Sequence, residues 1–145
     1  MPKQGSGIRD QGSEKQFLTP NPRPPISIIL GIDPGLQKTG YGVIKQDGNH
    51  LSFVACGVIQ SSKFQNKDEA DKLALSPRLL YLSNELGHVI VKYQPHEAAI
   101  EETFVSVNGQ STLKLGQARG ALLLTLAQTG LIASEYAATF QSSTQ

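Results

Sequence analysis

Apolar residues follow two different periods along the chain, and the change of period predicts the order of its elements. Short apolar runs rich in β-branched residues predict strands at 26–32, 41–46 and 51–60. Asp47-Gly48 predicts a tight hairpin between the second and third of these. Strict alternation along the third strand would place five residues on one face: Leu51, Phe53, Ala55, Gly57 and Ile59.

Helical spacing predicts two helices further along the chain. The first should begin with Ser76 as its N-cap and Pro77 in the first helical position, and end before Pro95. The second should cover about 111–129, with Gly130 just beyond its last turn. The buried face of the first helix is expected to consist of Leu79, Leu82, Leu86, Val89, Ile90 and Tyr93.

A short apolar strand at 98–100 separates the two helices, and a fifth strand is expected at 131–136. Three strands followed by helix, strand, helix and strand predict an antiparallel meander that continues into β–α–β crossovers. The fold class is therefore α/β: a mixed five-stranded sheet with helices on its faces, an order that matches the ribonuclease H-like fold.

Composition divides the chain into three parts. Residues 1–25 are rich in Gly, Pro, Ser, Gln and charge, which predicts a disordered tail. Residues 26–138 are expected to form one domain, and 139–145 a divergent end. No secretory signal or membrane-spanning run is visible, so a cytoplasmic address is expected. The single cysteine, Cys56, falls in an apolar strand and is expected to be a buried small residue.

Charge alone does not indicate a nucleic-acid partner. The net charge of the whole chain is +1. Residues 26–145 hold nine basic and ten acidic side chains. A domain that binds phosphates usually has a basic excess, which this one lacks.

Asp33 and Glu101 are the candidates for catalysis and for metal binding. Each closes a predicted strand, and a helical crossover makes those strands parallel neighbours about 4.8 Å apart. Two carboxylates at the same end of such strands can share Mg²⁺, or Mn²⁺ in its place. The competing interpretation is a turn residue at Asp33 and a solvated acid at Glu101.

Other polar and aromatic residues near this edge are weaker candidates. Glu102 should point away from Glu101 and is treated as a bystander. Phe104 lies in a loop after the acidic pair, where an aromatic ring can stack on bases or fold back onto the core. Lys114 and Arg119 are the basic residues of the second helix, able to meet phosphates or simply to face solvent.

Several strings together resemble the RuvC family of crossover junction endodeoxyribonucleases. They are Ile32-Asp33-Pro34-Gly35, Thr39-Gly40-Tyr41-Gly42, Ala99-Ile100-Glu101 with Phe104, and Leu113-Lys114-Leu115-Gly116-Gln117-Ala118-Arg119-Gly120. The resemblance implies a homodimer that binds four-way DNA junctions and nicks two strands symmetrically, in DNA recombination and repair. It also implies metal-bound carboxylates at Asp33 and Glu101, a junction contact at Phe104, and a branch-migration helicase as partner.

The family pattern continues beyond Ala138 into a final helix with two more metal-binding residues and DNA-contacting lysines. No acidic residue follows Glu135 in this sequence. We therefore interpret the chain as C-terminally truncated and expect these 145 residues to be catalytically dead or nearly so. Two alternatives stay open: a non-catalytic junction-binding or dimerising module, and another hydrolase of ribonuclease H-like fold.

Overall fold

The structure, a computed structural model, describes residues 24–61, 75–102 and 108–137. Most of the tail predicted to be disordered and the divergent end at 139–145 lie outside the described residues. The elements appear in the predicted order. They are β1 (Ile26–Asp33), β2 (Lys38–Asp47), β3 (His50–Gln60), α2 (Leu75–Tyr93), β4 (Glu97–Glu101), α3 (Gly109–Gln128) and β5 (Ala133–Tyr136).

The five strands form one mixed sheet in the order β3-β2-β1-β4-β5. The first three strands pair antiparallel, whereas β1 pairs with β4 and β4 with β5 in parallel. The change to parallel pairing follows from the helices α2 and α3, each of which returns the chain to the same end of the sheet. The predicted α/β fold with a mixed five-stranded sheet is confirmed.

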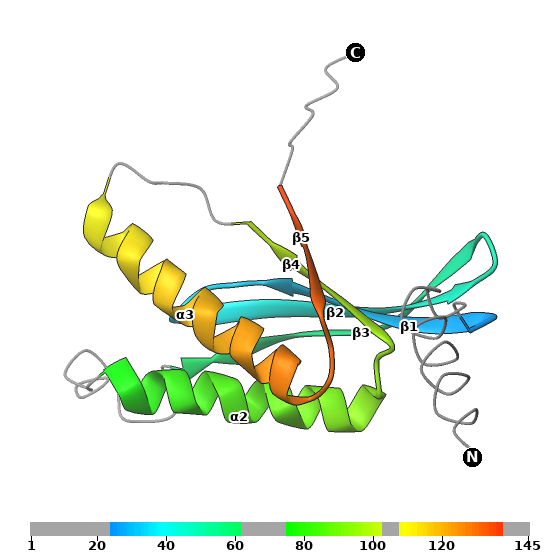
Figure 1. Cartoon of the computed structure of the whole chain (residues 1–145), viewed down its shortest axis with the longest axis horizontal. Helices are drawn as coiled ribbons and strands as arrows, with labels where there is room; N and C mark the ends of the chain where they lie inside the picture. Colours follow the sequence, from blue (N-terminus) through cyan, green and yellow to red (C-terminus); the bar gives the residue numbers. More distant parts are fainter. Residues whose placement is uncertain (1–23, 62–74, 103–107, 138–145) are drawn as a thin grey trace, which may run out of the picture.

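In the described part of the chain, α2 and α3 lie on the same face of the sheet (Figure 1). The core lies between this face and the helices, around Leu30, Ile32, Ile100, Leu86 and Leu122. The opposite face has no helix over it among the described elements. No helix in the described ranges is long and apolar enough to cross a membrane.

Helix α2 buries the predicted face but begins earlier than predicted. It starts at Leu75, so Ser76 and Pro77 lie within the first turn instead of capping it. Proline is tolerated there because the N–H groups of a first turn have no partner inside the helix. The helix ends at Tyr93, and Gln94 takes a positive φ of 49° while its N–H donates to the carbonyl of Ile90 at 2.9 Å.

Helix α3 begins two residues before its predicted start. Asn108 is the N-cap, and its side-chain oxygen accepts the N–H groups of Gln110 and Ser111 at 3.1 and 3.4 Å. The other end matches the prediction. Gly130 has φ 83°, and the N–H of Leu131 donates to the carbonyl of Leu126 at 2.9 Å, which is the Schellman arrangement.

The prediction that one face of β3 carries all five alternating residues is wrong. The β2–β3 register shifts between Val43 and Ile44, whose partners are Ala55 and Phe53, so Val54 is an extra residue. Such a bulge reverses the alternation beyond it. Phe53 and Leu51 are accordingly 73% and 59% exposed, whereas Ala55 packs on the core.

Cys56 is exposed, which contradicts its predicted burial. It stands opposite Gly42 in the register, on the face that the described helices leave uncovered. An apolar run therefore does not by itself tell which face of a strand is covered.

We predict that Gly130→Ala and Gly87→Ala change stability in opposite directions. At Gly130 the positive φ penalises any side chain, so unfolding should become easier by about 1 kcal/mol. At Gly87, inside α2, an added Cβ meets no atom within 4 Å. Alanine should there stabilise the helix by up to about 1 kcal/mol. Urea unfolding of both variants checks this, and a loss at Gly87 matching that at Gly130 would contradict it.

Candidate active site at the ends of the central strands

Asp33 and Glu101 lie together at the carboxyl ends of β1 and β4. Ile32 pairs with Ile100 in the parallel register, so the residue that follows each of them reaches the same edge of the sheet. The Asp33 side chain is exposed, and that of Glu101 is partly buried. The predicted juxtaposition of these two side chains is thus present in the fold.

The two carboxyl groups are close enough to affect each other's ionisation. Burial, a hydrogen bond with Asp33 and the negative charge of Asp33, in that order, raise the pKa of Glu101 above its usual 4.5. A hydrogen bond between two carboxyl groups needs a proton on one of them. The ionised pair is therefore an unfavourable arrangement that a positive charge would relieve.

The turn after Asp33 is held by Gly35 and Thr39. The buried Thr39 hydroxyl donates to the Gly35 carbonyl at 2.6 Å and accepts the Gly35 N–H at 3.2 Å. A Cβ on Gly35 would come within 2.2 Å of the Lys38 carbonyl oxygen, so only glycine fits this turn. These contacts fix the backbone at the point where Asp33 leaves the sheet.

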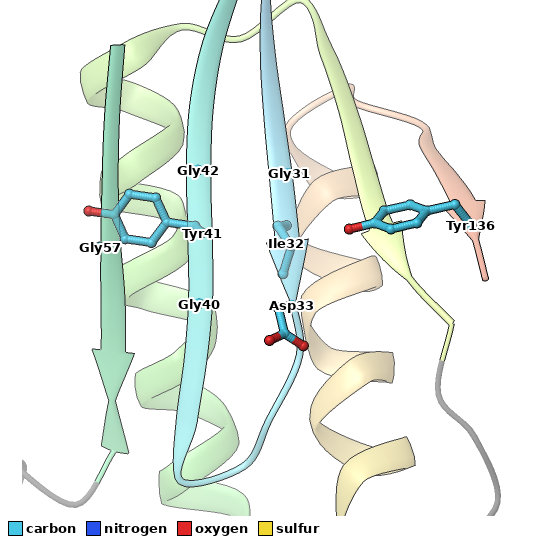
Figure 2. A pocket seen from close by; sticks show the side chains of 8 residues that line it. All are labelled: Gly31, Ile32, Asp33, Gly40, Tyr41, Gly42, Gly57 and Tyr136. Atoms are coloured by element: carbon cyan, nitrogen blue, oxygen red, sulfur yellow. The ribbon is translucent and has the colours of Figure 1, made fainter. Parts of the chain in front are cut away.

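A cavity of about 360 Å³ opens beside Asp33 (Figure 2). Glycines supply much of its wall, because Gly31, Gly40 and Gly42 present no side chain to it. The Cβ of Asp33 would lie 3.7 Å from a Cβ built on Gly40. These glycines keep the backbone uncluttered near the Asp33 carboxylate, and the space suits a small polar group.

Tyr136, to which no role was assigned from the sequence, also lines this cavity. It pairs with Glu101 at the end of β5, and its hydroxyl points from β5 towards β1 in Figure 2. Burial and then the negative charges of Glu101 and Asp33 raise the pKa of its phenol above 10.0. Its phenol therefore stays a hydrogen-bond donor at neutral pH. The signal that could have identified Tyr136 is its place at the end of β5, on the same edge of the sheet as Asp33 and Glu101.

Arg119 is largely buried and does not simply face solvent. Its side chain is 17% exposed, and its Nε donates to the backbone carbonyl of Glu101 at 3.2 Å. Its Nη2 lies 3.2 Å from the carboxylate of Glu135 in an ion pair. The two groups attract each other by charge but do not have hydrogen-bond geometry. The buried Nη2 therefore donates no hydrogen bond to any residue in the described ranges. Arg119 thereby ties α3 to the ends of β4 and β5.

The remaining candidates are Lys114, Glu102 and Phe104. Lys114 is exposed and lines a second cavity, beside the turn at Gly35–Lys38. Glu102 is exposed, and its N–H donates to the carbonyl of Tyr136 at 2.7 Å. Phe104 lies outside the described residues.

The arrangement offers two carboxylate ligands for a divalent cation. Carboxylate oxygens are the ligands that Mg²⁺ prefers, and it commonly retains several waters. Asp33 and Glu101 provide two such side chains at one edge. No set of three or more His, Cys, Asp or Glu converges among the residues that the structure describes.

We predict that Arg119→Gln lowers the free energy of unfolding by about 1–3 kcal/mol, because the carbonyl of Glu101 and the carboxylate of Glu135 lose a charged partner. Glu135 is 48% exposed, so Glu135→Gln should cost less. Lys114→Gln, on the same helix but exposed, is the control and should change stability by less than about 0.5 kcal/mol. If urea unfolding shows equal losses of unfolding free energy for Arg119→Gln and Lys114→Gln, the contacts of Arg119 with Glu101 and Glu135 do not stabilise the fold.

Comparison with known sequences places these features in a family. The family model described as "Crossover junction endodeoxyribonuclease RuvC" matches residues 29–142. A RuvC from Xanthobacter autotrophicus is 52% identical over 110 residues, which cover 76% of this chain and 60% of that protein. One from Ruegeria pomeroyi is 54% identical over 109 residues, covering 75% and 61%. The chain thus spans about three fifths of the length of these curated relatives.

Solved structures support the fold. The Thermus thermophilus RuvC in complex with a Holliday junction substrate has a TM-score of 0.63 at 20% identity, covering 77% of this chain and 65% of that one. The yeast mitochondrial Holliday junction resolvase Ydc2 has a TM-score of 0.56 at 18% identity, covering 81% and 55%. On the match to the family and the identity to its members, this chain belongs to the RuvC family.

Proposed function

We propose that this chain is the nuclease domain of a metal-dependent endonuclease that cleaves four-way DNA junctions symmetrically, in DNA recombination and repair. The observation that carries the proposal is the meeting of Asp33 and Glu101 at the ends of adjacent parallel strands, in a member of the RuvC family. The cavity beside Asp33 leaves room for a phosphodiester, and Tyr136 offers it a hydroxyl donor. These contacts bind and orient a phosphate.

Mg²⁺, with Mn²⁺ as the substitute, is the cofactor we propose for Asp33 and Glu101. The fit rests on the raised pKa of Glu101 beside Asp33, because the pair is unfavourable when both carboxyl groups are ionised without a cation. When bound, such ions activate water and stabilise the leaving oxygen in phosphodiester hydrolysis. Asp33 and Glu101 hold two of the coordination positions and are fixed by the strand ends that carry them.

We further propose that the domain acts as a homodimer through α3. Four residues spaced along one side of this helix are exposed: Leu113, Gly116, Gly120 and Leu124. Two exposed leucines that flank two glycines offer an apolar strip with room for close approach of a second helix. The branch-migration helicase partner, the junction contact of Phe104 and the cytoplasmic address stay predictions.

The test is a paired assay on a labelled four-way junction, with binding scored in EDTA and cleavage in Mg²⁺. We expect binding of wild type to prefer the junction over linear duplex. Any nicks should be symmetric and should be lost in Asp33→Asn and Glu101→Gln. Asp47→Asn, in the exposed β2–β3 hairpin, and Glu102→Gln, adjacent to the site, are the matched controls. Both controls should behave as wild type does.

The same assay tests the expected inactivity of these 145 residues. Loss of one charge-stabilising group costs about 10²–10³-fold in rate at comparable sites, so two carboxylates alone should cleave far more slowly than a full-length relative. Nicks at the relative's rate that vanish in Asp33→Asn would disprove the inactivity and support the function. Tight junction binding without nicks would favour the alternative of a non-catalytic binding module. Equal binding to linear duplex and junction would contradict junction specificity altogether.

We predict that Mg²⁺ stabilises the fold more at pH 7 than at pH 4. Because the pKa of Glu101 is raised in the folded state, the folded chain holds its proton more tightly than the unfolded chain does. In EDTA this contribution to stability is therefore present below the usual pKa of 4.5 and decreases as the pH rises through the raised value. Melting curves between pH 4 and 8, with and without Mg²⁺, measure it.

Asp33→Asn should reduce the loss of stability that accompanies rising pH in EDTA, because it removes a negative charge beside Glu101. It should also reduce the stabilisation by Mg²⁺, because it removes a ligand. Asp47→Asn is again the control. If Mg²⁺ raises the melting temperature of Asp33→Asn as much as that of wild type, the cation binds elsewhere.

A further inference from the structure

We propose that a second site, distinct from the carboxylate pair, binds a backbone phosphate of a nucleic-acid strand. It is a cavity of about 400 Å³ on the other side of the turn after Asp33, and we call it the basic cleft. Its walls come from the turn itself and from the first turns of α2 and α3. The lining residues that matter here are Lys38, Arg78, Ser111 and Lys114. This inference rests on the proposed function, since the ligand it names is the DNA of that reaction.

Charge is the first argument for an anionic ligand. Lys38, Arg78 and Lys114 line the cleft, and no acidic side chain does so among its described walls. None of the three forms an ion pair in the described part of the chain. The contact of Arg78 is with the neutral Ser61 hydroxyl at 3.4 Å. Three cations around one cavity, with no acidic side chain among its described walls, repel each other unless an anion lies among them.

The placement of Arg78 is the second argument. It stands in the first turn of α2, which contains no acidic residue. A cation at this end of a helix opposes the macrodipole and destabilises the helix. Helix formation therefore does not account for arginine here. The first turn of α3 likewise has no acidic residue, so the ends of both helices add positive potential to the cleft.

Proximity to the carboxylate pair is the third argument. The cleft is lined by Gly35, two residues beyond Asp33, so the backbone of the two sites is at most about 7.6 Å apart at this point. A strand whose scissile phosphate lies at Asp33 can thus place a flanking phosphate at Lys38. The rigid Gly35–Thr39 turn separates an acidic site from a basic one, as expected if one holds a cation and the other an anion.

The experiment measures affinity for a labelled junction in EDTA against salt, for Lys38→Gln, Arg78→Gln and Lys114→Gln. Each variant should lose at least about tenfold in affinity, the loss of one charged contact. The slope of log K against log salt should become shallower by about 0.9 for each contact removed from a duplex arm. Lys92→Gln, which removes the same charge from the far end of α2, is the matched control.

A stability readout separates binding from folding. The three substitutions relieve repulsion in the cleft, so the melting temperature of each variant should be unchanged or higher, while its affinity falls. A second probe is inorganic phosphate alone, followed by NMR shifts of the amides of Ser111 and Lys114. Shifts that saturate and that disappear in Lys114→Gln support the cleft as a phosphate site.

The outcomes distinguish this inference from the proposed function. If wild type prefers and nicks the junction but the three variants match Lys92→Gln, the cleft is refuted and the function stands. If the variants lose affinity for junction, duplex and single strand alike, and wild type prefers none of them, the cleft stands and junction specificity is refuted. If inorganic phosphate shifts the amide signals but the variants bind DNA as wild type does, the cleft binds phosphate and the proposal of a nucleic-acid ligand is overturned.

Discussion

Parallel pairing of β1 with β4 is the constraint on which the site depends. Ile32 and Ile100 are fully buried neighbours in that register, and the acids directly after them reach the same edge. The hydrophobic core thus determines where the two carboxyl groups stand. Two acidic side chains are held close although their ionised forms repel. A fold can impose such proximity because burial of the strands contributes far more free energy than one raised pKa costs.

Arg119 shows how a helix residue supports that edge. The sequence indicates only a basic residue on a helix, and such residues usually face solvent. In the structure its guanidinium group reaches the backbone of Glu101 and the side chain of Glu135 instead. Its role depends on how α3 crosses the sheet, which no local pattern specifies. The same holds for Tyr136, whose importance follows from its pairing with Glu101.

What could be predicted from the sequence was the part governed by local periodicity and turn chemistry. The order of the elements along the chain, the buried face around Leu82 and Leu86, and the glycine at 130 follow from spacing. The exposure of Cys56 depends on which face of the sheet the helices cover, and its predicted burial was wrong. The predicted start of α2 was also wrong. The juxtaposition of Asp33 and Glu101 could be predicted because the crossover rule converts sequence order into strand direction.

The bulge at Val54 gives the hairpin one spare residue that composition does not reveal. One extra residue separates Ala55, which packs on the core, from Phe53, which stands at the solvent side. Removal of Val54 alone would make the pairing regular and leave the outer half of β3 on its present faces, because Val43 still pairs with Ala55 and Ile44 with Phe53. Loss of a paired residue would instead shift its neighbours to the other face of the sheet unless the bulge absorbed the change. In this strand the position of a deletion therefore matters more than the chemical type of the residue removed.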